Sequence, residues 1–201
     1  MAWLRWRCTH AFRMVRAGKP WLAIRHPIRT MQRMLQRHGV DVLKAAVPDG
    51  AFLAYGTLLG IVRDGHLIPH DDDMDVGVFQ EDWDRIVPKT IPGFARLETS
   101  PYTVKFVHKK TGLVVDFFRF HPDGEHRRAH AGSDKGTHTY LFPRELLEPL
   151  GTIEWEGRTW TAPADPEGFL AHHYGADWRT PLPAWDYRTD AASDKTKQPR
   201  N

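Results

Sequence analysis

This 201-residue chain has few cysteines and lacks long apolar runs, and each of these absences excludes a class of protein or of site. Cys8 is the only cysteine, which excludes an internal disulfide and any zinc site built from several thiolates. No apolar run approaches the roughly 18 residues that a membrane-spanning helix requires. Arginines interrupt the N-terminal residues every few positions, which argues against a secretory signal. Hydrophobic residues make up 41% and charged residues 26%, which is typical of a globular domain.

Acidic residues are absent from residues 1–40, which contain nine lysines and arginines. Acids outnumber bases in the rest of the chain, so the sequence predicts a basic helical N-terminal arm over residues 1–48. Within it, residues 2–17 show the periodicity of an amphipathic helix. Three uses of the arm are open: contact of residues 1–25 with an anionic membrane surface, packing against the domain, or a targeting segment. We expect a cytoplasmic protein, with any membrane contact peripheral and at the inner face, and no nucleic-acid partner, because no base-reading motif is present.

Helical and strand-like segments alternate after the arm, and some strands are joined by hairpins. This predicts an α/β (α+β) domain with a mixed sheet over residues 49–187, followed by a disordered polar tail over residues 188–201. The predicted helices cover residues 27–39, with Gly39 as a stop, and residues 42–47, 57–63, 81–87, 144–147 and 166–174. The predicted strands cover residues 51–55, 74–79, 102–108, 113–120 and 139–142, with a hairpin over 153–160. Residues 121–138 are rich in His, Gly, Asp and Arg and are expected to form a mobile loop.

Four aspartates fall within the five residues 71–75, where an apolar strand begins. Alternation along a strand places Asp73 and Asp75 on one face, where Asp71 can join them, while Asp72 points away. Carboxylates this close repel one another by about 1–4 kcal/mol a pair, so the arrangement calls for cations. Asp116 interrupts another apolar strand, where a lone buried carboxylate is costly. If the two strands are neighbours, Asp116 completes a site of oxygen ligands that suits Mg²⁺ or Mn²⁺.

Two other interpretations of the acidic run are open. Acidic runs are often solvated loops, although the apolar strand that follows argues against this here. An EF-hand-like calcium loop would start at Asp71. It would then require glycine at the position of Val76 and glutamate at that of Asp82.

The segment Tyr55-Gly-Thr-Leu-Leu-Gly-x-x-Arg63 predicts a strand end, a tight turn and the first turns of a helix. Helix N-termini bind phosphate, Gly56 permits close approach, and the Thr57 hydroxyl can donate a hydrogen bond. Arg63 is a candidate phosphate clamp, because guanidinium matches phosphate bidentately, and Lys105 is a second candidate anion ligand. For both side chains an ordinary solvated position is the alternative.

This segment, followed by Ile68-Pro-x-Asp-Asp-Asp-x-Asp75, resembles the LicD family, which includes the fukutin-related transferases. Similarity extends over about residues 51–183, including Phe142-Pro143 and Tyr174-Gly-x-x-Trp178-x-x-Pro181. The resemblance implies a nucleotidyltransferase-like mixed β-sheet flanked by helices, as in polymerase β, with a Gly-Thr turn, an Asp-x-Asp strand and a third carboxylate. Two departures are that His70 replaces the usual tryptophan and that the cysteine-rich zinc element of larger relatives is missing.

The resemblance also implies a reaction. Family members are taken to transfer a phospho-substituent, such as phosphocholine or a polyol phosphate, from a CDP-linked donor to a hydroxyl of a glycan or lipid-linked glycan, with release of CMP. Two metal ions held by Asp73, Asp75 and Asp116, with Asp71 as a further ligand, would serve this chemistry. Asp116 is the first candidate to accept the proton of the acceptor. The alternatives are a nucleotidyltransferase that uses an NTP and releases pyrophosphate, and a catalytically silent metal- or nucleotide-binding module.

Overall fold

The structure is a computed structural model that describes residues 27–69, 71, 73–133, 136–182 and 190–193. The predicted helix over residues 2–17 and the predicted membrane contact of residues 1–25 lie outside the described residues, as do His70 and Asp72. In the described part of the chain, no helix is both long enough and apolar enough to cross a membrane.

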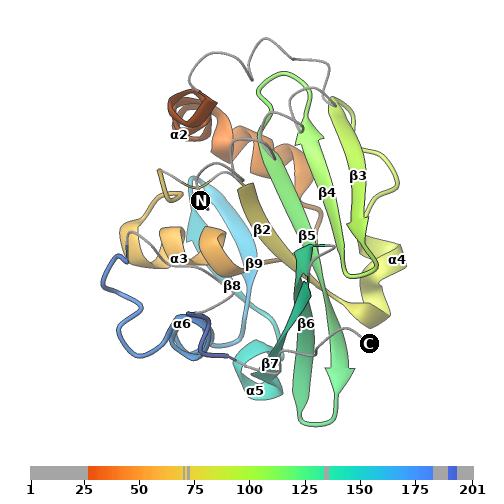
Figure 1. Cartoon of the computed structure of the whole chain (residues 1–201), viewed down its shortest axis with the longest axis vertical. Coiled ribbons are helices and arrows are strands. Elements are labelled where there is room, and N and C mark those ends of the chain that lie inside the picture. The colour runs from red at the N-terminus through yellow and green to blue at the C-terminus, as the bar shows by residue number, and fades with distance from the viewer. Residues whose placement is uncertain (1–26, 70, 72, 134–135, 183–189, 194–201) are drawn as a thin grey trace.

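A mixed sheet forms the centre of the molecule (Figure 1). Its strands run in the order β1 (Phe52–Leu53), β2 (Asp73–Phe79), β5 (Val114–Asp123), β4 (Thr103–His108) and β3 (Phe94–Ser100). Strands β2 and β5 are parallel, and the other neighbours are antiparallel. The far end of β5 pairs with β6 (His126–Ser133), which pairs with β7 (Gly136–Pro143). Strands β8 (Gly151–Trp155) and β9 (Arg158–Ala162) form a separate hairpin.

Helices lie around this sheet, which confirms the predicted α+β class. They are α2 (Pro27–Ala46), α3 (Tyr55–Asp64), α4 (Trp83–Ile86), α5 (Arg144–Leu147) and α6 (Pro166–Tyr174), with a 3₁₀ turn, η2 (Gln80–Asp82), before α4. Helices α3 and α6 contact each other beside β2, and α2 passes behind β4 and β5 in Figure 1. The N-cap of α6 is Asp165, whose side chain accepts a hydrogen bond from the Gly168 N–H.

The predicted helix stop at Gly39 is wrong, because α2 continues through this residue to Ala46. The helix buries an apolar stripe formed by Leu35, Val42, Leu43 and Ala46, on both sides of Gly39. Glycine inside a helix costs roughly 1 kcal/mol relative to alanine, and packing of this stripe into the core outweighs that cost. Part of the predicted arm therefore packs in the core, while the proposed division at residue 48 stays a prediction.

The predicted mobile loop over residues 121–138 is also wrong. Strand β5 extends to Asp123, and most of the remaining residues belong to the β6–β7 hairpin. Ala129 and Tyr140 face each other in this hairpin and are almost fully buried. Strand β3 was not predicted either, and residues 191–193, assigned to the polar tail, pack against α6 through the Ala192 N–H and the His173 carbonyl.

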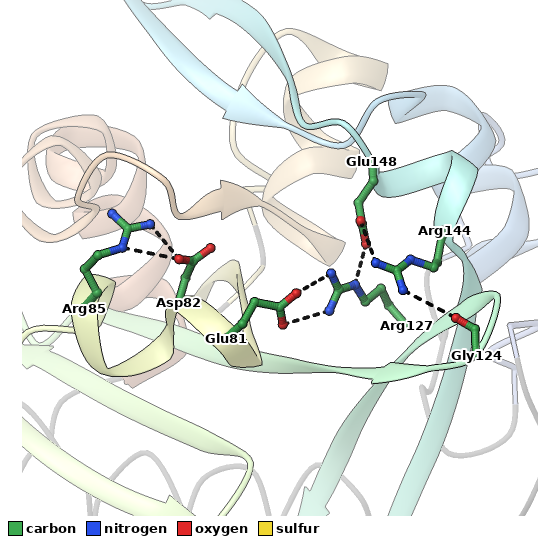
Figure 2. A network of polar contacts seen from close by, with 7 residues as sticks. All are labelled: Glu81, Asp82, Arg85, Gly124, Arg127, Arg144 and Glu148. Carbon is green, nitrogen blue, oxygen red and sulfur yellow. Dashed lines mark hydrogen bonds and ion pairs between the residues drawn. The ribbon is translucent and has the colours of Figure 1, made fainter.

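An ion-pair network holds the end of β2 to the β6–β7 hairpin (Figure 2). Arg127 is 2% exposed, and its Nη1 and Nη2 nitrogens donate to the two carboxylate oxygens of Glu81 over 2.9 and 2.6 Å. Its Nε donates to Glu148, which also accepts from Arg144 over 3.0 Å. The guanidinium lies 4.2 Å from the Phe79 ring centroid. Two carboxylates and an aromatic face thus compensate a buried cation that joins η2, β6 and the residue after α5.

Candidate functional site

The register of three neighbouring strands builds an acidic site on one face of the sheet. Asp75 on β2 lies directly opposite Asp116 on the parallel strand β5, and Asp116 lies opposite Lys105 on β4. Asp73 precedes Asp75 by two residues and shares its face. The two carboxylate-bearing strands are neighbours, which is the condition that the sequence analysis set for Asp116 to join the site.

Three carboxylates converge at this site, because oxygen atoms of Asp73, Asp75 and Asp116 all lie within 4.8 Å of one another. Asp116 is 1% exposed, and its Oδ1 has no hydrogen-bond partner in the described part of the chain. A buried carboxylate oxygen without a donor is costly, and a metal ion would satisfy it. Three carboxylates with one buried, unsatisfied oxygen therefore fit a hard divalent cation such as Mg²⁺ or Mn²⁺.

Lys105 supplies positive charge inside the cluster. Its ammonium makes an ion pair with Asp116 Oδ2 and lies 3.7 Å from Asp73 Oδ2. The side chain is 18% exposed, so solvent screens these contacts only in part. Lys105 was predicted as an anion ligand, and its direct contact with the carboxylates was missed. A sequence signal existed, because residues 105 and 116 are symmetrical about residues 109–112, which separate the predicted strands 102–108 and 113–120.

The N-terminus of α3 adjoins the same carboxylates. The Gly56 N–H donates to Asp75 Oδ2 over 3.0 Å, and the Asp75 N–H donates to the Thr57 hydroxyl oxygen over 2.7 Å. A Cβ at Gly56 would lie 2.6 Å from Asp71 Oδ2, so Asp71 also lies against this helix end. Thr57 is buried, and the hydrogen bond that its hydroxyl oxygen accepts from Asp75 connects α3 to β2.

Arg63 lies at the other end of α3, where it is bonded to Asp64. Its Nε and Nη2 nitrogens donate to the two Asp64 carboxylate oxygens over 2.9 and 2.7 Å. The charge of Arg63 also acts on Tyr174. Burial, followed by the negative charges of Asp75 and Asp71, raises the pKa of the Tyr174 phenol well above 10.0, and the positive charge of Arg63 opposes this rise. Arg63 and the aspartates of the site therefore act electrostatically on the same tyrosine.

Tyr55 has an unusual backbone that the sequence analysis did not predict. Its φ is +42°, a left-handed conformation that costs a non-glycine residue about 1–3 kcal/mol. Its ring packs among aromatic side chains, with centroids 5.0 Å from Phe118 and 4.8 Å from His173. The strained residue lies immediately before Gly56, whose N–H it aims at Asp75. No sequence signal marks a positive φ at a tyrosine, because the surrounding rings come from distant strands and helices.

Comparison with known proteins shows that part of this chain matches the model of a domain family. The family model described as "LicD/FKTN/FKRP, nucleotidyltransferase domain" matches residues 50–165, which include every residue of the acidic site. An uncharacterised protein of Rickettsia prowazekii is 32% identical over 85% of this chain and 58% of its own length. An uncharacterised protein of Rickettsia typhi is 31% identical over 65% of this chain and 39% of its own length.

Human ribitol-5-phosphate transferase FKTN is 26% identical over 80% of this chain and 35% of its own length. The chain thus spans roughly one third to three fifths of the length of these relatives.

Proposed function

Because the chain belongs to the LicD/FKTN/FKRP nucleotidyltransferase-domain family, we propose that it is a phosphotransferase that moves a substituted phosphate onto a glycan hydroxyl. The donor in this proposal is CDP-linked, with phosphocholine or a polyol phosphate such as ribitol 5-phosphate as the transferred group, and CMP leaves. The acceptor is a glycan or lipid-linked glycan of the cell envelope. The name of the FKTN relatives supports the class of transferred group.

One observation carries this proposal. Three carboxylates from β2 and β5 meet within 4.8 Å, and the buried one has an oxygen without a hydrogen-bond donor in the described part of the chain. A bound Mg²⁺ or Mn²⁺ would neutralise the diphosphate of the donor and the charge that develops on the leaving oxygen. In the proposal Asp73, Asp75 and Asp116 hold the cation, with Asp71 as a further ligand.

The remaining residues bind and orient the substrates. In the proposal the start of α3, at Gly56 and Thr57, lies against a donor phosphate. Arg63 and Lys105 supply positive charge toward the same anion. In the proposal Asp116 also accepts the proton of the attacking glycan hydroxyl, through the carboxylate oxygen that does not bind the cation.

The test is identification of the nucleotide product. Purified protein is incubated with CDP-choline, CDP-ribitol, CDP-glycerol or each NTP, together with Mg²⁺ or Mn²⁺ and a glycan acceptor, and the products are separated by chromatography. We expect CMP from a CDP-linked donor and headgroup phosphate on the glycan. Asp75→Asn is the matched control and should release none.

The same experiment distinguishes the two alternative functions. Pyrophosphate from an NTP, with no CMP from any CDP-linked donor, would identify a nucleotidyltransferase. Binding of nucleotide and Mn²⁺ without either product would identify a catalytically silent module.

For the arm, we propose cytoplasmic placement with peripheral contact at the inner face of the membrane. Nine basic residues without an acid in residues 1–40 support this. Flotation with anionic liposomes at low salt is the measurement, and deletion of residues 1–25 should reduce binding while turnover of a soluble acceptor stays largely unchanged. Full-length protein that ignores anionic liposomes at low salt, where screening is weakest, would contradict the membrane contact.

A further inference from the structure

Lys105 lies where a cation of the carboxylate cluster would lie. Its ammonium contacts Asp116 Oδ2 and approaches Asp73 Oδ2 to 3.7 Å, so it bridges two of the three proposed metal ligands. Strand register holds it there, because Lys105 is directly opposite Asp116 in the antiparallel pair β4–β5. Asp116 is buried and Lys105 is 18% exposed, so solvent screens their contact only in part.

An ammonium and a divalent cation compete for the same oxygens. Carboxylates attract both, but the two cations repel each other at the distances of this cluster. Lysine has a flexible four-carbon stem, so its ammonium can withdraw while its backbone stays in the sheet. The side chain keeps some exposure, which leaves room for that movement toward solvent.

We propose that Lys105 is an exchangeable internal cation: it neutralises Asp73 and Asp116 in the metal-free protein and leaves them when a divalent cation binds. The inference rests on the metal site of the proposed function and assigns Lys105 a role before substrate arrives. Lys105 keeps the crowded carboxylates together without metal, and it lowers their affinity for metal. Withdrawn from the carboxylates, the ammonium is on the side of the sheet that would face a donor phosphate.

The first measurement is Mn²⁺ affinity by isothermal titration calorimetry of the full chain. Lys105→Gln should lower the dissociation constant for Mn²⁺ at least about tenfold, because it removes a cation from the site. Lys105→Arg keeps the charge and should stay within about threefold of wild type. Lys109→Gln is the matched control, because Lys109 is an exposed lysine in the turn that joins the same two strands. Thermal unfolding without metal should show Lys105→Gln less stable than Lys109→Gln.

The second measurement uses the unaltered protein and does not depend on a variant that folds. Lysines are acetylated briefly with an N-hydroxysuccinimide ester, with and without Mn²⁺, and the rates at Lys105 and Lys109 are compared by mass spectrometry. Acetylation of Lys105 should be slow without metal and several-fold faster with Mn²⁺, while Lys109 is unchanged.

Each contrary result is distinct. Wild-type protein that binds no Mn²⁺ would overturn the metal site of the proposed function. Wild-type protein that binds Mn²⁺, with Lys105→Gln binding no tighter or Lys105 acetylation unchanged, would overturn the exchange alone. An equal gain in affinity for Lys105→Arg and Lys105→Gln would also overturn it, because packing and not charge would then be the cause.

Discussion

Gly56 and Asp75 are joined by a hydrogen bond in which the Gly56 N–H donates to Asp75 Oδ2 over 3.0 Å. The contact fixes one carboxylate of the acidic site against the first turn of α3. A side chain at residue 56 has no room, because its Cβ would lie 2.6 Å from Asp71 Oδ2 and 3.3 Å from Asp75 Oδ2.

Gly56→Ala should therefore displace Asp71 and Asp75 and weaken Mn²⁺ binding by at least about tenfold, which is 1.4 kcal/mol. Calorimetric titration with Mn²⁺ is the measurement. Gly65→Ala is the control. Gly65 caps the other end of α3 at a φ of +74°, and a Cβ there would have no atom within 4 Å. This variant should therefore be less stable than wild type but keep the wild-type affinity for Mn²⁺. Equal Mn²⁺ affinity in Gly56→Ala and wild type would contradict the placement of Asp71 and Asp75 in the site.

Arg63→Lys should lower the proposed transfer activity at least about tenfold, because an ammonium keeps the charge and loses the bidentate geometry. The quantity to measure is kcat/KM for CMP release. Arg85→Lys is the control, because Arg85 also donates through Nε and Nη2 to a nearby carboxylate, that of Asp82, and is 71% exposed. If both variants lost activity equally, Arg63 would have no special role toward phosphate.

Glu81→Gln should destabilise the protein at pH 7 by about 1 kcal/mol, a value discounted for the exposure of Glu81. The hydrogen bond from Arg127 lowers the pKa of Glu81 below 4.5. A depressed carboxyl pKa stabilises the fold above pH 4.5, and this contribution disappears as pH falls through the folded-state pKa.

The difference between Glu81→Gln and wild type, measured by urea unfolding, should accordingly shrink below pH 4.5. Asp82→Asn, which breaks only the exposed pair with Arg85, should change stability little at any of these pH values. A constant difference from pH 7 to pH 3 would show that Glu81 stabilises through packing and not through its charge.

His173 should make the fold sensitive to mild acid. Burial, followed by the nearby His172, lowers the pKa of His173 to about 3. Its usual pKa is 6.5, so the unfolded chain binds this proton between about pH 6.5 and pH 3 and the folded chain does not. The contribution of neutral His173 to the free energy of unfolding is therefore fully present above pH 6.5, and the fold loses stability as pH falls below this value.

His173→Phe should remove part of that decline, since phenylalanine fits among the rings of Tyr140 and Phe142 and cannot titrate. Unfolding free energy measured from pH 7.5 to pH 4.5 checks this, with His126→Gln, at an exposed position of β6, as control. A pH profile for His173→Phe with the wild-type slope would contradict a neutral buried His173.

The β6–β7 hairpin, which the sequence analysis predicted as a loop, shows where sequence patterns do not predict structure. Residues 126–133 are mostly polar and give little hydrophobic alternation, so the chain resembles a loop there. They form β6 because β5 extends far enough to pair with them and because β7 pairs on the other side. Arg127 is buried there only because Glu81 and Glu148, distant in sequence, reach its guanidinium.

The sequence by itself determined the family, the α+β class and the aspartates that carry the candidate chemistry. These follow from local patterns: a Gly-Thr turn, two aspartates spaced by the strand period, and one charge inside an apolar strand. Tertiary structure decided what surrounds them. Strand register sets Lys105 against Asp116, and rings from distant segments hold Tyr55 at a positive φ. Both depend on contacts between residues far apart in the chain, where packing and pairing outweigh the preferences of any short segment.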